Sequence, residues 1–173
     1  ADDAVEAAIR ELIGVTESKI LYTNELWDIT EFTVPENAHS LADLALMPYL
    51  ENLTIMNQNL GTLSDLSSLS KLETLNLSGS SFPAEELAVL AKLPVLKNLN
   101  LSNCSLSTIA DLAGAPSLTN LNLSSNTLRN LDVLTPMTSL AEINLNHNAV
   151  TDLSALKDLP NLVKLTFAAD EAR

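Results

Sequence analysis

The side chains that could carry out covalent or metal chemistry are few and widely separated. The chain of 173 residues contains one cysteine, Cys104, and two histidines, His39 and His147. Nucleophilic catalysis needs a serine or cysteine next to a base, and a zinc site needs several His or Cys ligands at short spacing. The acidic residues do not follow the pattern of a calcium-binding loop, and four glycines cannot build a phosphate-binding loop. We therefore predict no enzymatic activity, no metal and no cofactor.

Regularly spaced leucines determine where the other side chains must lie. Six of them begin the phrase L-x-x-L-x-L, or a copy of it with Ile or Phe at one position, at intervals of 22, 24, 22, 22 and 22 residues: Leu50, Leu72, Leu96, Leu118, Leu140 and Leu162. With each of these leucines counted as offset 0, apolar residues recur at offsets 0, 3, 5 and 10. This is the signature of leucine-rich repeats. It predicts an α/β fold, a right-handed solenoid with a curved parallel sheet.

The alternation at offsets 3 and 5 predicts one short strand per coil, with both residues pointing into a shared core. At offset 8 the chain turns inside the coil, where buried backbone groups need partners. An Asn side chain can bridge neighbouring coils there because its amide both donates and accepts hydrogen bonds. We interpret Cys104 as a buried structural residue of this row. The row comprises Gln58, Ser80, Cys104, Asn126 and Asn148, together with Asn37 in a degenerate first coil that begins at Ile29.

The far side of each coil is expected to begin with a short capped turn. Residues of the helix-cap type stand at or next to offset 12. They are Ser40, Thr62, Thr108, Asn130 and Asp152. The 24-residue copy is predicted to carry a true helix instead. Pro83 suits its first helical position, and Leu87, Leu90 and Ala91 recur at helical spacing.

Residues 1–28 do not follow the repeat and are predicted to form a helical N-terminal cap. Asp3 and Glu6 are spaced like a capping box, and Gly14 is a helix stop signal. A second short helix is predicted to begin with Thr23 as its cap. The single tryptophan that follows, Trp27, is expected to pack this cap against the first coil.

Residues 29–173 are predicted to form about six coils and a final strand, in one continuous domain with the cap. Nothing apolar follows the final strand at 162–167, so a C-terminal cap is missing from the sequence. We expect either that the natural protein continues past Arg173 or that a partner or second copy covers this end.

The charge of the chain argues against two classes of partner. Its net charge is −13, with nine Lys and Arg residues dispersed along the sequence, whereas nucleic acids and anionic membranes require clustered basic residues. No apolar run approaches the roughly 20 residues of a membrane span. Residues 1–36 hold nine acidic and two basic residues, a net charge of −7. This end is either a solvated acidic cap or a docking site for a basic partner.

Offsets 2, 4 and 6 should point outward from the concave sheet. These positions are polar, nearly uncharged and almost free of aromatic anchors, so they are either a solvated surface or a binding face. The face projects to roughly 460 Å², which suits a weak or peptide-like contact. If it binds a protein or peptide, we expect the C-terminal half to do so. The candidate ligand-binding residues are Asn100, Asn122, Glu142, Asn144, Asn146, His147 and Lys164.

Both parts of the chain resemble bacterial leucine-rich-repeat proteins of the 22-residue class, as in the internalin family and related surface proteins. The resemblance lies in the stretch DDAVEAAIRELIG…TNELWDITEFTV and in the repeats. It implies a bacterial, secreted or cell-surface module that binds a protein ligand, often as one part of a longer polypeptide. The enlarged coil, the varied offset 8 and the missing aromatic residues of the concave face depart from the family. A structural spacer and an intracellular regulatory scaffold remain alternatives.

Overall fold

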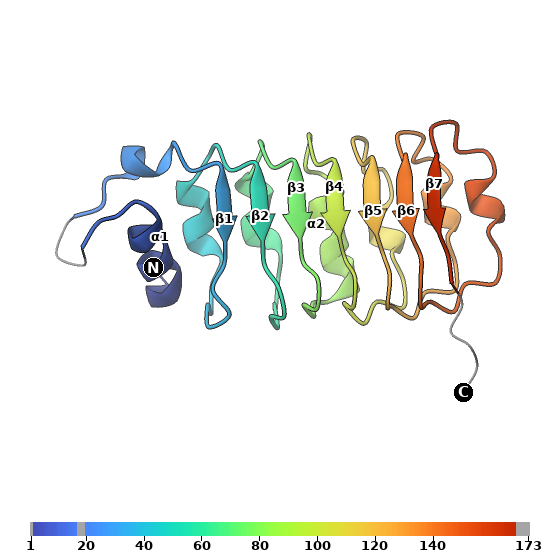
Figure 1. The fold of residues 1–173 in the computed structure, drawn as a ribbon, viewed down its shortest axis with the longest axis horizontal. Coiled ribbons are helices and arrows are strands. Elements are labelled where there is room, and N and C mark those ends of the chain that lie inside the picture. The colour runs from blue at the N-terminus through green and yellow to red at the C-terminus, as the bar shows by residue number, and fades with distance from the viewer. Residues whose placement is uncertain (1, 17–19, 169–173) are drawn as a thin grey trace.

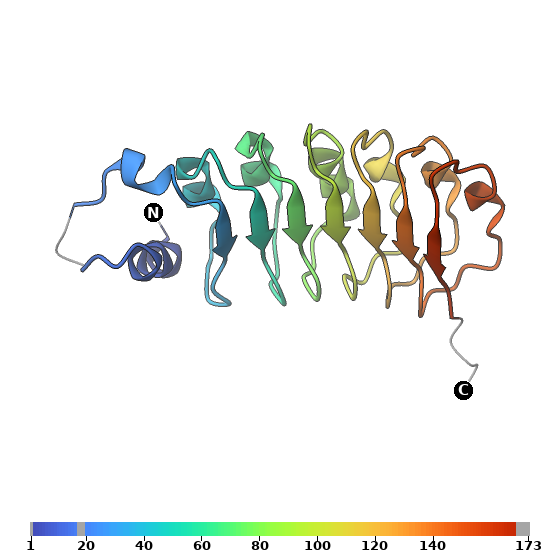
Figure 2. The same ribbon diagram turned by 45° about the horizontal axis from the view of Figure 1, so that its top comes forward.

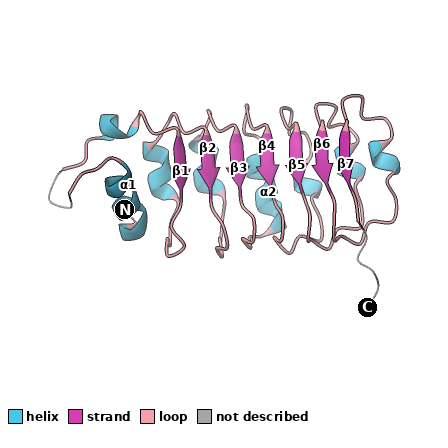
Figure 3. Cartoon of the chain, viewed as in Figure 1, coloured by secondary structure: helices cyan, strands magenta, loops and turns pink. Residues whose placement is uncertain are grey.

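The computed structural model describes residues 2–16 and 20–168. The chain forms a row of stacked coils, with strands on one face and short helices on the other (Figure 1, Figure 3). The strands form a single parallel sheet in chain order. They are β1 (Glu31–Thr33), β2 (Asn52–Thr54), β3 (Thr74–Asn76), β4 (Asn98–Asn100), β5 (Asn120–Asn122), β6 (Glu142–Asn144) and β7 (Lys164–Thr166).

The helices of the repeats lie behind the sheet (Figure 2). Most are single 3-10 turns: η2 (Ala42–Leu46), η3 (Ser64–Ser68), η4 (Ala84–Glu86), η5 (Ala110–Leu112), η6 (Asp132–Leu134) and η7 (Ser154–Leu156). One more 3-10 turn, η1 (Thr23–Leu26), precedes β1. The α-helices are α1 (Asp3–Leu12), which precedes the repeats, and α2 (Leu87–Leu90). Within the described parts of the chain, no helix is long and apolar enough to cross a membrane.

The core is a stack of aligned leucines, as the repeat predicts. Leu99, Leu121 and Ile143 occupy matching register positions in β4, β5 and β6, and each is only 2% exposed. At offset 5, Leu123 and Leu145 are fully buried, whereas Phe167 in the final coil is 38% exposed. A single coil could not bury these side chains, so each coil depends on its neighbours. The predicted solenoid with one parallel sheet is confirmed.

The predicted cap-type residues accept hydrogen bonds from the first N–H of each turn, although the N-cap position itself is held by the leucine or isoleucine that follows each of them. The side-chain oxygen of Thr62 accepts a hydrogen bond from the backbone N–H of Ser64 at 3.0 Å, and Asp152 Oδ1 accepts from Ser154 at 2.8 Å. The same bond, to the N–H two residues later, recurs at Ser40, Thr108 and Asn130. A 3-10 turn follows each of these residues because a 22-residue coil has little room for more.

The 24-residue coil carries an α-helix, but a short one. The 3-10 turn η4 continues into α2, whose Leu87 and Leu90 are buried. Pro83 does not occupy the first helical position, so this expectation was wrong. Its φ of −59° is helical, but its ψ of 134° is extended, and Pro83 therefore directs the chain into the turn without belonging to it.

Helix α1 begins one residue earlier than the sequence predicts. Asp2, not Asp3, is its N-cap, because Asp2 Oδ1 accepts hydrogen bonds from the N–H groups of Ala4 and Val5 at 3.0 and 3.2 Å. Asp3 is the first helical residue, so the proposed capping box of Asp3 and Glu6 was wrong. Gly14, at φ +69°, ends the helix as expected. Val5 belongs to the common core.

The second helix of this region is the 3-10 turn η1. Tyr22, not Thr23, stands at its N-cap position, and Trp27 follows it 49% exposed. Trp27 is therefore not enclosed between the cap and the first coil. The division into a cap of residues 1–28 and repeats of residues 29–173 stays a prediction, and residues 1, 17–19 and 169–173 lie outside the described residues.

Asp2 also ties α1 to the first coil. Its Oδ2 atom accepts hydrogen bonds from the N–H groups of His39 and Ser40 at 2.7 and 2.9 Å. These bonds, the one from His39 above all, hold the pKa of the Asp2 carboxyl below its ordinary value of 3.8, although burial opposes them. Ionised Asp2 is therefore an acceptor for four backbone donors on two segments of the chain.

We expect Asp2→Asn to lower the free energy of unfolding by about 1–2 kcal/mol at pH 7, because an amide NH₂ would then face the N–H groups of His39 and Ser40. The folded-state pKa is lowered, so the stabilisation by Asp2 is present above pH 3.8 and is lost as the pH falls through the folded pKa. Urea unfolding at several pH values should show the deficit shrinking in acid. Asp3→Asn, at an exposed neighbour, is the control, and an equal loss there would refute the role of Asp2.

Candidate functional site

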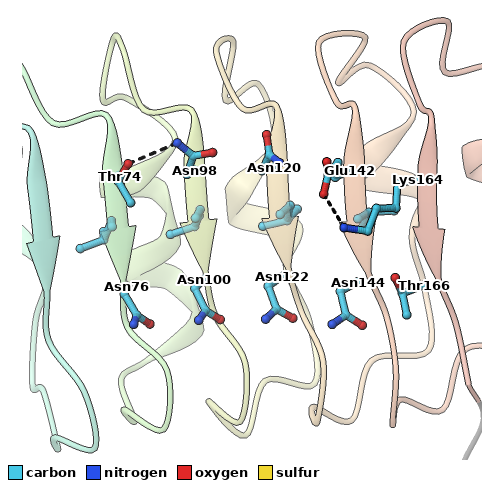
Figure 4. Close-up of a pocket in the computed structure, with 14 residues that line it drawn as sticks. Thr74, Asn76, Asn98, Asn100, Asn120, Asn122, Glu142, Asn144, Lys164 and Thr166 are labelled. Atoms are coloured by element: carbon cyan, nitrogen blue, oxygen red, sulfur yellow. Dashed lines mark hydrogen bonds and ion pairs between the residues drawn. The ribbon is translucent and has the colours of Figure 1, made fainter.

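An open hollow of about 390 Å³ lies on the outward face of strands β3 to β7 (Figure 4). We call the outward residues at offsets 2 and 4 of these strands the sheet face. They alternate with the buried leucines because successive side chains of a strand point to opposite sides. The sheet face comprises Thr74, Asn98, Asn120, Glu142 and Lys164 at offset 2, and Asn76, Asn100, Asn122, Asn144 and Thr166 at offset 4.

The asparagines at offset 4 use their amides in one common way. The Oδ1 atoms of Asn76, Asn100, Asn122 and Asn144 each accept a hydrogen bond from the N–H two residues later, at 3.0–3.1 Å. Only the amide oxygen can accept from an N–H group, so the Nδ2 side must point away from the backbone. Figure 4 shows the four amides in the same orientation. In the described structure, the Nδ2 groups of Asn100, Asn122 and Asn144 have no hydrogen-bond acceptor.

The offset 2 row is largely satisfied by contacts between neighbouring strands. Asn98 Nδ2 donates to Thr74 Oγ1 at 3.2 Å, and Lys164 Nζ pairs with Glu142 Oε2 at 2.9 Å (Figure 4). The ion pair neutralises the charges of the sheet face. The hollow is therefore an uncharged surface with hydrogen-bond donors along its offset 4 row.

The structure brings together five of the seven candidate ligand-binding residues. Asn100, Asn122, Glu142, Asn144 and Lys164 all line the hollow. The other two, Asn146 and His147, lie past the strand, in the turn that follows β6. Asn146 Oδ1 is buried and has no hydrogen-bond partner among the described residues. His147 is exposed and takes a left-handed conformation, with φ 56°.

This left-handed turn recurs at offset 7, and it was not predicted from the sequence. The residues there have φ between 56° and 72°: Asn57, Gly79, Asn103, Ser125 and His147. The N–H at this offset donates to the carbonyl at offset 6 of the next coil, as from Asn103 to Ser124 at 2.9 Å. The enrichment of Asn and Gly was the available signal, because both tolerate φ > 0 better than other residues. A Cβ on Gly79 would also lie 2.1 Å from Asn57 Oδ1.

Behind the turn, offset 8 forms the predicted bridge between coils. Asn126 Oδ1 accepts from the N–H groups of Cys104 and Leu106, and its Nδ2 donates to carbonyls of both coils. Cys104 is buried and its thiol donates to Leu77 at 3.2 Å, and burial raises the pKa of the thiol to about 11. Such a thiol is a packing residue and a poor nucleophile. Asn37 is exposed, so its predicted place in the buried row was wrong.

The sequence matches no family profile and no curated protein. Three internalin-type structures from Listeria monocytogenes have the same fold. The internalin InlF has a TM-score of 0.74 at 22% identity, with 96% of this chain and 56% of that chain covered. Internalin C2 has a TM-score of 0.72 at 19% identity, with 96% and 93% covered. InlP has a TM-score of 0.71 at 17% identity, with 99% and 58% covered.

The stacked coils and single parallel sheet define this chain as a leucine-rich-repeat protein. More particularly, its fold is the internalin-like form of that solenoid, as the sequence resemblance predicts. The chain spans only about half the length of InlF and of InlP. Among the described residues, no group of three His, Cys, Asp or Glu side chains could hold a metal ion.

Proposed function

We propose that this protein is a non-enzymatic interaction module that binds a protein or peptide through the sheet face and its rim. The observation that carries the proposal is the donor row formed by Asn100, Asn122 and Asn144. Each amide oxygen is already engaged by the backbone, while the Nδ2 groups face the hollow without an acceptor in the described structure. Successive strands lie about 4.8 Å apart, so the row offers donors at a regular spacing.

The chemistry of this row specifies the kind of ligand. A complementary ligand supplies acceptors, such as backbone carbonyls or the side-chain oxygens of Asp, Glu, Asn and Gln. The ion pair of Glu142 and Lys164 lies on β6 and β7, at the C-terminal end of the sheet face, and can bind a polar group of the ligand. The likeness in fold to internalins supports a secreted or cell-surface location in a bacterium and a place within a larger protein.

We expect Asn122→Asp to weaken ligand binding roughly ten-fold, the loss of about one strong hydrogen bond. The carboxylate can still accept from Ser124 N–H, so the local turn is kept while the outward donor becomes an acceptor. The probe is a peptide selected from a displayed random library on the wild-type protein, and its affinity is measured by fluorescence anisotropy.

The matched control is Asn59→Asp, which adds the same charge at an exposed position outside the sheet face. Its affinity for the selected peptide should stay within two-fold of wild type. Equal binding by wild type and Asn122→Asp would contradict the proposal. A library that yields no peptide would also contradict it and would favour a structural spacer, which needs no ligand.

A further inference from the structure

All tyrosines and the only tryptophan of the chain lie at the N-terminal end of the solenoid, and none of the three is buried. Trp27 and Tyr49 are each 49% exposed, and Tyr22 is 60% exposed. Their rings could cover a large apolar area in a core. The solenoid instead leaves them at its surface. Trp and Tyr are enriched among the residues that contribute most binding energy to protein interfaces, so their exposure here points to a contact surface.

Trp27 and Tyr49 form a fixed pair at one edge of the sheet. Their ring centroids are 6.5 Å apart in a T-shaped arrangement, with an interplanar angle of 74°. Trp27 lies just before β1 and Tyr49 just before β2, one coil later. The two segments are held together by a hydrogen bond from the N–H of Glu51 to the carbonyl of Thr30 at 2.8 Å. We call Trp27 and Tyr49 the aromatic pair.

The sequence around the aromatic pair is acidic. Asp28 directly follows Trp27, and Glu51 lies two residues after Tyr49. Both are exposed, and neither side chain has an ion pair or hydrogen bond within the described structure. In the coil after Glu51, Glu73 is neutralised by Lys97 at 2.9 Å. No Lys or Arg occurs between positions 20 and 70, whereas seven acidic residues do: Glu25, Asp28, Glu31, Glu36, Asp43, Glu51 and Asp65.

We propose that the aromatic pair, with Asp28 and Glu51, is a docking surface for an arginine-bearing basic segment of a partner protein. A guanidinium group can stack on the face of Trp27 while its N–H groups pair with a carboxylate. The aromatic pair supplies the anchor, and the unpaired carboxylates select a cationic occupant. This surface lies at β1 and β2, apart from the hollow on β3 to β7, so it is a second contact site independent of the sheet face.

Trp27 makes the test direct, because it is the only tryptophan and its fluorescence reports on this surface alone. The probe is a short synthetic peptide of alternating arginine, glycine and leucine, and its matched control carries citrulline, which is uncharged, at each arginine. We expect a saturable change of Trp27 emission with the arginine peptide and about ten-fold or weaker affinity for the citrulline peptide. The double variant Asp28→Asn/Glu51→Gln should lose about the same factor.

The control variant Glu85→Gln/Asp111→Asn removes two exposed charges elsewhere and should change the affinity less than two-fold. Three results would each overturn the proposal: no saturable change of emission, an equal loss in the control variant, or equal binding of the citrulline peptide. Trp27→Leu, followed by anisotropy of a labelled arginine peptide, tests the aromatic part. If this variant does not fold, the charge variants still decide the outcome. Asn122→Asp should leave the binding of the arginine peptide unchanged, so the proposal for one site can be refuted without refuting the proposal for the other.

Discussion

Asn126→Ala is expected to lower the free energy of unfolding by about 3–5 kcal/mol. The Asn126 amide accepts from Cys104 and Leu106 at 3.1 and 2.9 Å and donates to Leu101 and Leu123 at 2.8 and 2.9 Å. Alanine would leave four buried backbone groups without these partners, and each buried unsatisfied group costs about 1–3 kcal/mol. Relaxation of the turn and entry of water would offset part of that sum.

Urea unfolding followed by circular dichroism measures this loss. The control is Asn122→Ala, the same substitution four residues away on the sheet face, where the side chain is only partly buried. It should cost about 1 kcal/mol or less, since its backbone partner at Ser124 can bind water instead. Equal losses at the two positions would show that the inner bridge has no special importance.

The second large effect is expected in the leucine stack. Leu121→Ala should destabilise the protein by about 2–5 kcal/mol, because Leu121 is 2% exposed and lies in register between Leu99 and Ile143. The cavity left by the removed leucine atoms would not close, since the coils on either side hold the backbone in place. Thermal and urea unfolding both report the loss.

Leu12→Ala is the matched control for the leucine stack. Leu12 is 54% exposed at the end of α1, so its replacement should change stability by about 0.5 kcal/mol or less. Hydrogen exchange should also show the Leu121→Ala effect greatest in β4, β5 and β6, because coupling in a solenoid runs between nearest neighbours. A loss spread evenly over the chain would contradict that part of the prediction.

Much of the sheet face could be predicted from the sequence, because the direction of each side chain follows from its position within a short strand. Strand alternation places Asn100 and Asn122 outward and Leu99 and Leu121 inward, and the constant period puts equivalent residues in register. The use of each amide atom could not be predicted in this way. It depends on where the backbone turns after the strand, and the positive φ of His147 and its counterparts was not predicted from the sequence.

The ends of the array were harder to predict than its middle. The cap of α1 was assigned to Asp3, although Asp2 has the better geometry because it also reaches the N–H groups of His39 and Ser40. Spacing along one helix contains no information about a loop some 37 residues away. The exposure of Trp27 was missed for a similar reason, because its partner Tyr49 belongs to the following coil.

The sequence by itself determined the period, the buried leucines and the polar character of the sheet, since these follow from short-range alternation and from the burial of apolar surface. Only the tertiary structure decided which amide donors of Asn122 and its neighbours face outward, and that Trp27 and Tyr49 meet beside unpaired carboxylates. The amide orientation depends on the turn after each strand, which a backbone hydrogen bond to the next coil holds in place, as from Ser125 to Asn146. The aromatic pair joins rings from two successive coils. Both therefore depend on contacts between coils, which no single repeat contains.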